Sequence, residues 1–143
     1  MRTSGLRVEA REGFDEVVPV RALHLHELQV EDSLFDLMLL SERTYDTDWI
    51  ATLAARHLTA DGAIVVCQNG IKDARAAALV GAERTVGCVV TFAGSLLEPG
   101  HVIRADAYPV ALRVGALPDV GGPRVEDVAY VLNHVVITDI TPT

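Results

Sequence analysis

The stretch from Ala63 to Gly70 reads Ala-Ile-Val-Val-Cys-Gln-Asn-Gly and decides the fold that this sequence predicts. Its apolar part is rich in β-branched residues and too short for a helix, so we expect a strand buried on both faces of a parallel sheet. After Gln68, the pair Asn69-Gly70 can adopt the left-handed backbone of a tight exit. Ligands bind outside the carboxyl ends of strands in open α/β sheets, which makes this turn a candidate site. Asn-Gly is also an ordinary turn signal, and that alternative stays open.

Two further apolar runs have the character of buried strands, Leu34 to Leu40 and Thr85 to Thr91. A helical pattern separates each of them from the Ala63 strand, and such alternation is typical of a parallel sheet with right-handed crossovers. We therefore expect an α/β fold built on three parallel strands with flanking helices.

The first of these helices should begin with a cap at Asp46 or Thr47 and end near Leu58, before a turn at Asp61-Gly62. The spacing of apolar residues predicts an inward stripe made of Ile50, Leu53, Ala54 and Leu58. Trp49 lies beside this stripe and is expected to pack against the protein rather than to hold a cofactor.

The second helix should run from Ile71 to Val80 and end at Gly81. Its predicted inward residues are Ile71, Ala74, Ala78 and Leu79. Lys72, which follows the Asn-Gly turn, is expected at the surface.

The flanking segments predict antiparallel pairing. Gly5 to Ala10 and Glu16 to Val20 alternate apolar and polar residues around a turn, which indicates a hairpin. The turn signal Glu98-Pro99-Gly100 precedes similar alternation at His101 to Arg104 and Val110 to Val114, which indicates a small antiparallel add-on.

The last part of the chain completes the pattern. Pro118 to Pro123 is expected to be a loop, Arg124 to Asn133 a helix, and Val135 to Ile140 a final strand. The helix should bury Val125, Val128, Ala129 and Leu132.

The length, hydropathy and net charge of the chain exclude several classes of protein. At 143 residues it is expected to form a single domain, residues 1–143, with a real core. No apolar run is long enough for a membrane span and the start lacks a signal-peptide pattern, so we expect a cytoplasmic protein with no membrane partner. The net charge of −8 repels polyanions and argues against a nucleic-acid partner, although a few local donors would still hold a small phosphorylated cofactor.

No metal site is predicted. Cys67 and Cys88 lie in apolar strand patterns without metal-ligand spacing, so buried free thiols are expected. His24, His26 and Glu27 lie close together, but no further ligands follow at a recognised spacing. Exposed polar residues in a connection explain them.

Seven short segments together carry a likeness in order and spacing to one family: Gly5 to Glu9, Phe35 to Leu40, Tyr45 to Thr47, Gln68 to Ile71, Gly81 to Arg84, Val86 to Val90 and Leu96 to Gly100. Through them the chain resembles the ketopantoate reductases, also called 2-dehydropantoate 2-reductases. The resemblance implies a Rossmann-like, dinucleotide-binding sheet. It also implies NADPH-dependent reduction of 2-dehydropantoate, a 2-oxo acid, to pantoate on the route to pantothenate and coenzyme A. In that reaction, hydride passes from the nicotinamide to the 2-oxo carbon and a protein acid supplies the proton.

The resemblance also implies a cofactor site. Asn69 matches the family asparagine that contacts cofactor and substrate, with Gln68 and Gly70 beside it. Arg43 falls where the family usually has lysine, and a solvated loop arginine is the alternative for it. Glu42 replaces a residue that is usually small or apolar, which would place a carboxylate near the cofactor phosphates and weaken binding.

Two family features do not occur in the sequence. No Gly-x-Gly-x-x-Gly phosphate loop is present; in the family it opens the first strand and would lie upstream of Met1. The family's catalytic lysine and substrate-orienting glutamate belong to a helical domain that would follow Thr143, so no catalytic residue is assigned here. The chain is therefore expected to be the latter part of an NADP-binding domain, and whether it acts as an enzyme by itself is left open.

Two other functions remain open. A non-catalytic remnant or interaction module would keep the sheet without the chemistry, and an ordinary α/β ligand-binding domain would use Asn69 only as a turn residue. Because the absent first strand of this fold normally lies beside the Leu34 strand, we also expect an unpaired apolar edge through which two copies form a homodimer.

Overall fold

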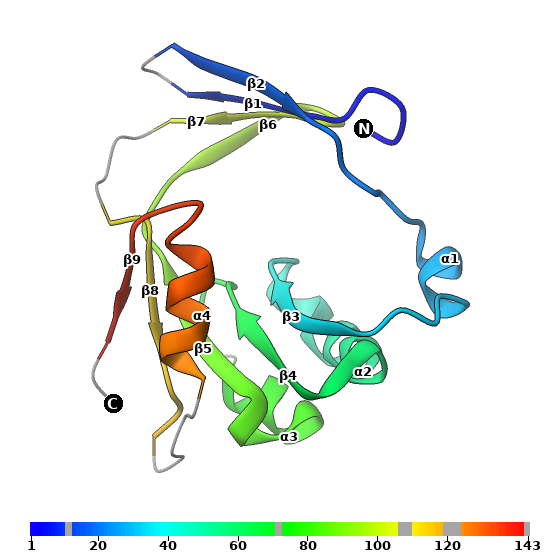
Figure 1. The fold of residues 1–143 in the computed structure, drawn as a ribbon, viewed down its shortest axis with the longest axis vertical. Coiled ribbons are helices and arrows are strands. Elements are labelled where there is room, and N and C mark those ends of the chain that lie inside the picture. Colours follow the sequence, from blue (N-terminus) through cyan, green and yellow to red (C-terminus); the bar gives the residue numbers. More distant parts are fainter. Residues whose placement is uncertain (11–12, 71–72, 106–109, 119–123, 142–143) are drawn as a thin grey trace. The chain divides into compact units, whose positions relative to one another are not determined.

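The computed structural model describes residues 1–143 except 11–12, 71–72, 106–109, 119–123 and 142–143 (Figure 1). The chain forms two compact units. The smaller unit comprises Met1–Asp32 and Phe92–Pro109, and the larger unit comprises Ser33–Thr91 and Val110–Thr143.

The larger unit is an α/β fold around a five-stranded sheet of order β3-β4-β5-β8-β9. The strands β3 (Phe35–Leu40), β4 (Leu58–Val66) and β5 (Thr85–Val90) run parallel, as the sequence predicts. The expected burial of the first strand is wrong, because β3 lies at the edge of the sheet and only its last residue, Leu40, is buried. Beyond these three strands, β8 (Leu112–Gly115) pairs antiparallel with β5, and β9 (Thr138–Ile140) pairs parallel with β8. The predicted last strand is thus confirmed in its place and is shorter than expected.

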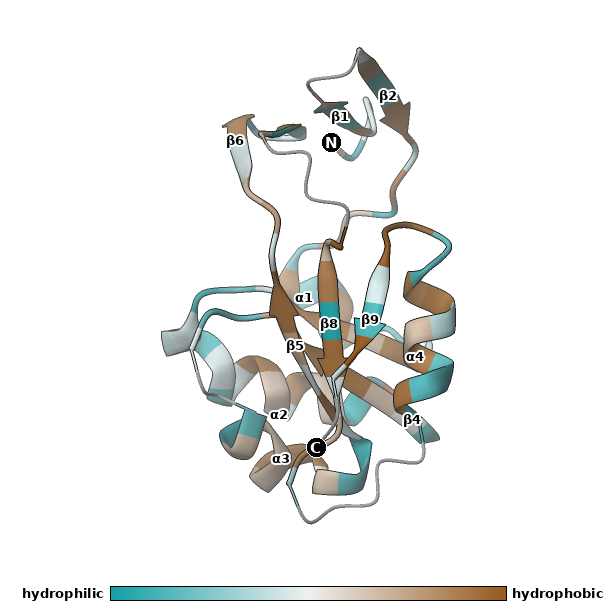
Figure 2. Cartoon of the chain, turned by 90° about the vertical axis from the view of Figure 1, so that its left-hand side faces the viewer, coloured by the Kyte–Doolittle hydropathy of each residue, from teal (hydrophilic) through white to brown (hydrophobic). Residues whose placement is uncertain are grey.

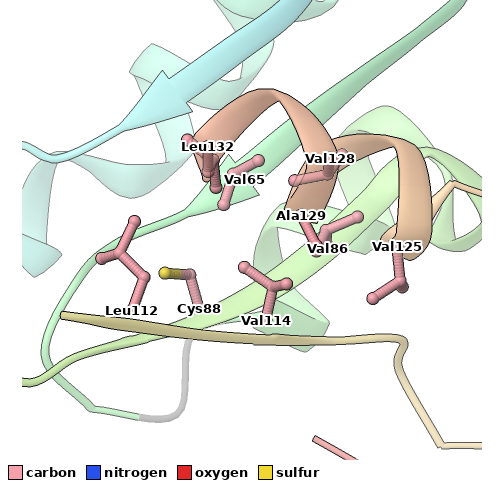
Figure 3. Close-up of a cluster of buried hydrophobic side chains, with 9 residues drawn as sticks. All are labelled: Val65, Val86, Cys88, Leu112, Val114, Val125, Val128, Ala129 and Leu132. Atoms are coloured by element: carbon pink, nitrogen blue, oxygen red, sulfur yellow. The ribbon is translucent and has the colours of Figure 1, made fainter. Parts of the chain in front are cut away.

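Helices cover the two faces of this sheet. Side chains of α2 (Thr47–His57) and α3 (Asp73–Val80) form one core with Ile64, and those of α4 (Val125–Leu132) form another with Val65. Figure 3 shows the α4 side chains directed toward those of the strands. Both faces of β4 are therefore buried over residues 63–66, which explains the continuous apolar run there. The strands β5 and β8 are also mostly hydrophobic in Figure 2.

The predicted inward face of α4 is confirmed, because all of its members are buried: Val125, Val128, Ala129 and Leu132. The prediction succeeded because the apolar residues of α4 are spaced so that they fall on one face. Only Tyr130 and Val131 lie outside that face, and both are exposed.

The predicted face of α2 is confirmed in part, because Ala54 is buried and Ile50 packs against the same core. The buried side chains of this helix are Thr47, Ala51, Ala54 and His57. Ile50 and Leu53 are half-buried, and Leu58 is buried as the first residue of β4. The small side chains of Ala51 and Ala54 allow close packing on the core, so size decides the face more than hydrophobicity does.

The start of α2 also differs from the expectation. Asp46 occupies the N-cap position, but its side chain makes no capping hydrogen bond. Its carboxylate instead accepts a hydrogen bond of 2.7 Å from Nε1 of Trp49. Trp49 is 48% exposed, so it packs against the protein over only part of its surface.

The end of α3 is as predicted, whereas its inward face is not. Gly81 has φ of 106° and its N–H bonds the carbonyl of Ala77, which stops the helix. The buried residues are Ala76 and Val80, while Ala74, Ala78 and Leu79 are exposed. Alanines on every side of this helix give it little periodicity, so the sequence signal was weak. The predicted Ile71 and Lys72 lie outside the described residues.

The start of β4 is earlier than predicted and carries a bulge. Phe35 pairs with Leu58 and Leu37 with Ala63, so residues 59–62 of β4 lie opposite one residue of β3. The predicted turn at Asp61-Gly62 is thus an irregularity within the strand. A Cβ atom at Gly62 would lie 2.7 Å from the carbonyl oxygen of Phe35, so this close approach requires glycine.

The smaller unit contains a four-stranded sheet of order β2-β1-β7-β6. The hairpin of β1 (Leu6–Ala10) and β2 (Phe14–Val18) is confirmed. A second hairpin joins β6 (Gly94–Glu98) to β7 (His101–Arg104), and β7 pairs parallel with β1. The predicted antiparallel add-on is therefore divided, because the 110–114 segment pairs in the larger unit instead.

Two expected connections remain, together with the question of a membrane span. A short helix, α1 (Leu25–Gln29), occupies part of the segment that was expected to be a polar connection. Most of the predicted loop Pro118 to Pro123 lies outside the described residues. Within the described part of the chain, no helix is both long and apolar enough to cross a membrane.

Leu132→Ala tests the core between α4 and the sheet. Leu132 is 6% exposed, so we expect its truncation to lower the free energy of unfolding by about 2–5 kcal/mol, measured by urea denaturation. Val131→Ala, on the exposed face of the same helix, should change it by about 0.5 kcal/mol or less. Equal losses in the two variants would contradict this packing.

Candidate functional site

A pocket of about 420 Å³ lies in the larger unit, at the carboxyl end of β4. The described residues that line it are Gln68, Asn69, Gly70, Asp73, residues 87–90 of β5, Arg113, Gly115, Ala116 and Thr141. Its volume is within the range of about 300–1,000 Å³ that is usual for small-molecule sites.

Two glycines of the sheet make room for the pocket wall. A Cβ atom at Gly87 would lie 2.9 Å from Oδ2 of Asp73, and one at Gly115 would lie 3.3 Å from the carbonyl oxygen of Thr141. The missing side chains allow Asp73, the first residue of α3, to approach β5. Burial raises the pKa of the Asp73 carboxyl.

Three of the four residues predicted as cofactor contacts meet at this pocket. Gln68, Asn69 and Gly70 all line it, and Asn69 and Gly70 are exposed there. Gly70 has φ of 92°, which confirms the predicted left-handed exit from the strand. Arg43 does not line the pocket. It lies at the start of the short 3-10 helix η1 (Thr44–Asp46), with an exposed side chain.

Gln68 differs from its two neighbours because it is buried, at 7% exposure. Its Oε1 accepts a hydrogen bond of 2.7 Å from the Thr47 hydroxyl, and its Nε2 donates to the carboxylate of Glu42. Burial raises the pKa of Glu42, and the nearby Asp46 carboxylate raises it further. The polar atoms of the Gln68 side chain are therefore engaged within the protein.

Sequence reasoning missed several residues of this site. Asp73 and Arg113 line the pocket, and Thr47 holds Gln68 from the start of α2. Thr47 lies in a segment that carries the family likeness, so that signal was available. Arg113 comes from an antiparallel strand whose place in the sheet is a tertiary feature, and no local pattern indicates it.

The side chains considered for a metal have other contacts. Glu27 forms an ion pair with Arg2 at 2.7 Å, which lowers the pKa of its carboxyl to about 2. The rings of His24 and His26 stack with centroids 5.7 Å apart. Among the described residues, no three His, Cys, Asp or Glu side chains are grouped as metal ligands.

Both cysteines are free thiols. Cys88 is buried as predicted, and Cys67 is half-buried beside the same core. The adjacent Cys88 thiol, together with burial, raises the pKa of Cys67.

Glu42→Gln tests the buried carboxyl beside Gln68. Because the pKa of Glu42 is raised in the folded chain, stability should fall as pH rises from the ordinary value of 4.5 through the raised pKa. The amide variant removes that loss, so its gain in the free energy of unfolding should be larger at about pH 7 than at about pH 4. The control is Glu126→Gln, on the exposed face of α4. An equal gain in the free energy of unfolding at both pH values would contradict the raised pKa of Glu42.

The chain matches a family model described as "Ketopantoate reductase PanE/ApbA" over residues 1–119. No match was found among curated proteins.

Solved structures share this fold. The 2-dehydropantoate 2-reductase from Geobacter metallireducens GS-15 is 26% identical with a TM-score of 0.77, and the match covers 99% of this chain and 46% of that one. A D-mandelate dehydrogenase solved with NADH and anilino(oxo)acetate is 15% identical with a TM-score of 0.76, covering 98% of this chain and 44% of that one. A dimeric ketopantoate reductase from Staphylococcus aureus is 14% identical with a TM-score of 0.66, covering 96% and 43%. The latter two are alike in fold alone. This chain spans slightly less than half the length of each of these three structures.

Proposed function

Because the chain belongs to the ketopantoate reductase family, we propose that it provides part of the cofactor and substrate site of an NADPH-dependent reductase that converts 2-dehydropantoate to pantoate. The observation that carries this proposal is the position of Asn69. It is exposed and lines a pocket at the carboxyl end of a parallel strand, where open α/β sheets bind their ligands.

The residues of the pocket fit the nicotinamide end of such a cofactor. The Asn69 amide both donates and accepts hydrogen bonds, so it suits a carboxamide on one side and a 2-oxo acid on the other. The bound cofactor would supply the hydride. Asn69 would hold the two reactants in a fixed orientation and donate a hydrogen bond to the oxygen on which negative charge develops.

The phosphate end of the cofactor has fewer candidates in this chain. Arg43 is exposed on the segment that leaves β3, the strand next to β4, so its positive charge would attract a pyrophosphate. Glu42, directly before it, opposes that attraction when ionised. We propose Arg43, Asn69 and Gly70 as the residues of this chain that contact the cofactor, with the buried Gln68 directly before Asn69 in the turn.

A second candidate function is an interaction module that keeps the sheet without the reaction. The absence of a Gly-x-Gly-x-x-Gly loop from the sequence favours it. So does the edge formed by β3, which among the described strands pairs with β4 alone. Leu39 of β3 is 52% exposed, and we propose that two copies of the chain associate through this edge.

Asn69→Ala tests the reductase proposal. We expect the chain to bind NADPH saturably at micromolar concentration, followed by cofactor fluorescence, and the variant to bind about tenfold more weakly because an amide contact is lost. Arg56→Ala, exposed on α2 and outside the pocket lining, should bind as the unchanged chain does. No binding by the unchanged chain at millimolar NADPH would leave the interaction-module function in its place.

Leu39→Lys tests the β3 edge. A lysine on an edge strand opposes strand pairing, so the variant should be monomeric at micromolar concentration where the unchanged chain is dimeric, as measured by light scattering. Val131→Lys, at a similarly exposed position on α4, should remain dimeric. A monomeric unchanged chain would rule out association through this edge.

A further inference from the structure

We propose that Gln68 acts as a positioning residue: its side chain ties the Asn69-Gly70 turn to β3 and α2 and thereby holds Asn69 at the pocket. The expected effect on NADPH affinity rests on the proposed function. The positioning of Asn69 does not, because it is a property of the chain without cofactor. This inference revises the expected part of Gln68 from a direct contact of the cofactor to a support for its neighbour.

The first step of the argument is where the backbone pairing of β3 and β4 ends. The N–H of Cys67 donates to the carbonyl of Leu40 at 2.8 Å. Beyond this bond the two chains separate, one toward Glu42 and the other toward Asn69. The hydrogen bond between the side chains of Gln68 and Glu42 continues the connection where the backbone no longer provides one.

The second step is that both ends of the Gln68 amide are held. The Nε2 of Gln68 donates to the carboxylate of Glu42. The amide oxygen accepts from the Thr47 hydroxyl at 2.7 Å. Thr47 is itself 1% exposed, and its hydroxyl also lies 2.8 Å from the carbonyl oxygen of Thr44. The Gln68 side chain thus bridges the segment that follows β3 and the start of α2.

The third step concerns the contrast between adjacent residues. Gln68 is buried, whereas Asn69 and Gly70 are exposed, and a Cβ atom at Gly70 would meet nothing within 4 Å. Asn69 and Gly70 therefore have little packing against the described part of the chain. Their position at the pocket depends on the anchored residue that precedes them.

Thr47→Val is the test, because valine keeps the shape of the side chain and removes the hydroxyl that faces Gln68. Thr47→Ser restores a hydroxyl and should restore the behaviour of the unchanged chain. The matched control is Thr52→Val, on the same helix, whose hydroxyl bonds the carbonyl of Asp48 and has no contact with Gln68.

Two measurements are made on each variant. In ¹H–¹⁵N spectra without cofactor, we expect Thr47→Val to shift or broaden the backbone signals of Asn69 and Gly70 and to speed solvent exchange of the Gln68 side-chain amide. With NADPH, we expect affinity to fall about tenfold, which corresponds to about 1.4 kcal/mol. Thr47→Ser and Thr52→Val should leave both readouts unchanged.

The outcomes separate this inference from the proposed function. Changed signals for the turn in a chain that binds no NADPH would support positioning and count against the reductase proposal. Unchanged turn signals and unchanged affinity in Thr47→Val would overturn the inference, even with a lowered melting temperature. Should Thr47→Val fail to fold, Glu42→Ala removes the partner of the amide nitrogen from a half-buried position; unchanged signals of Asn69 and Gly70 would again overturn it.

Discussion

The pairing of β4 with a parallel strand on each side is the constraint on which the larger unit depends. Parallel neighbours cannot be joined by a tight turn, so α2 and α3 must return the chain to the opposite end of the sheet. Both faces of the second half of β4 are then covered, and its residues 63–66 are apolar without interruption. The same constraint brings the exits of β3 and β4 to one edge of the sheet, where Glu42 and Gln68 meet.

Glycines and alanines shape the pocket and the core beside it as much as larger side chains do. Glycines at 87 and 115 let the start of α3 and the segment after β9 approach the sheet. Ala51 and Ala54 allow α2 to pack closely on the core. The two polar side chains of the turn at the pocket differ. That of Gln68 is hydrogen-bonded within the protein, and that of Asn69 is exposed at the pocket. This division separates residues that support the site from residues available to a ligand.

Family membership and fold agree for this chain. The chain spans slightly less than half of the solved reductase structures it resembles. It contains a pocket at the carboxyl end of β4, an exposed amide at that strand end and an exposed arginine on the neighbouring segment. A glycine-rich phosphate loop does not occur in its sequence. Among the described residues, the pocket and the edge strand β3 are the features on which the proposals for its function rest.

The sequence by itself determined the three parallel strands, the buried face of α4 and the turn at Asn69-Gly70, because each depends on local patterns: continuous β-branched runs, helical spacing and a glycine suited to positive φ. Only the tertiary structure decided which faces of α2 and α3 are buried, since alanines fit on any side of a helix and close packing selects among them. It alone also placed Arg113 and Asp73 at the pocket and engaged the Gln68 amide with Thr47 and Glu42. Those contacts join residues far apart in the chain, and no local pattern records which of them will meet.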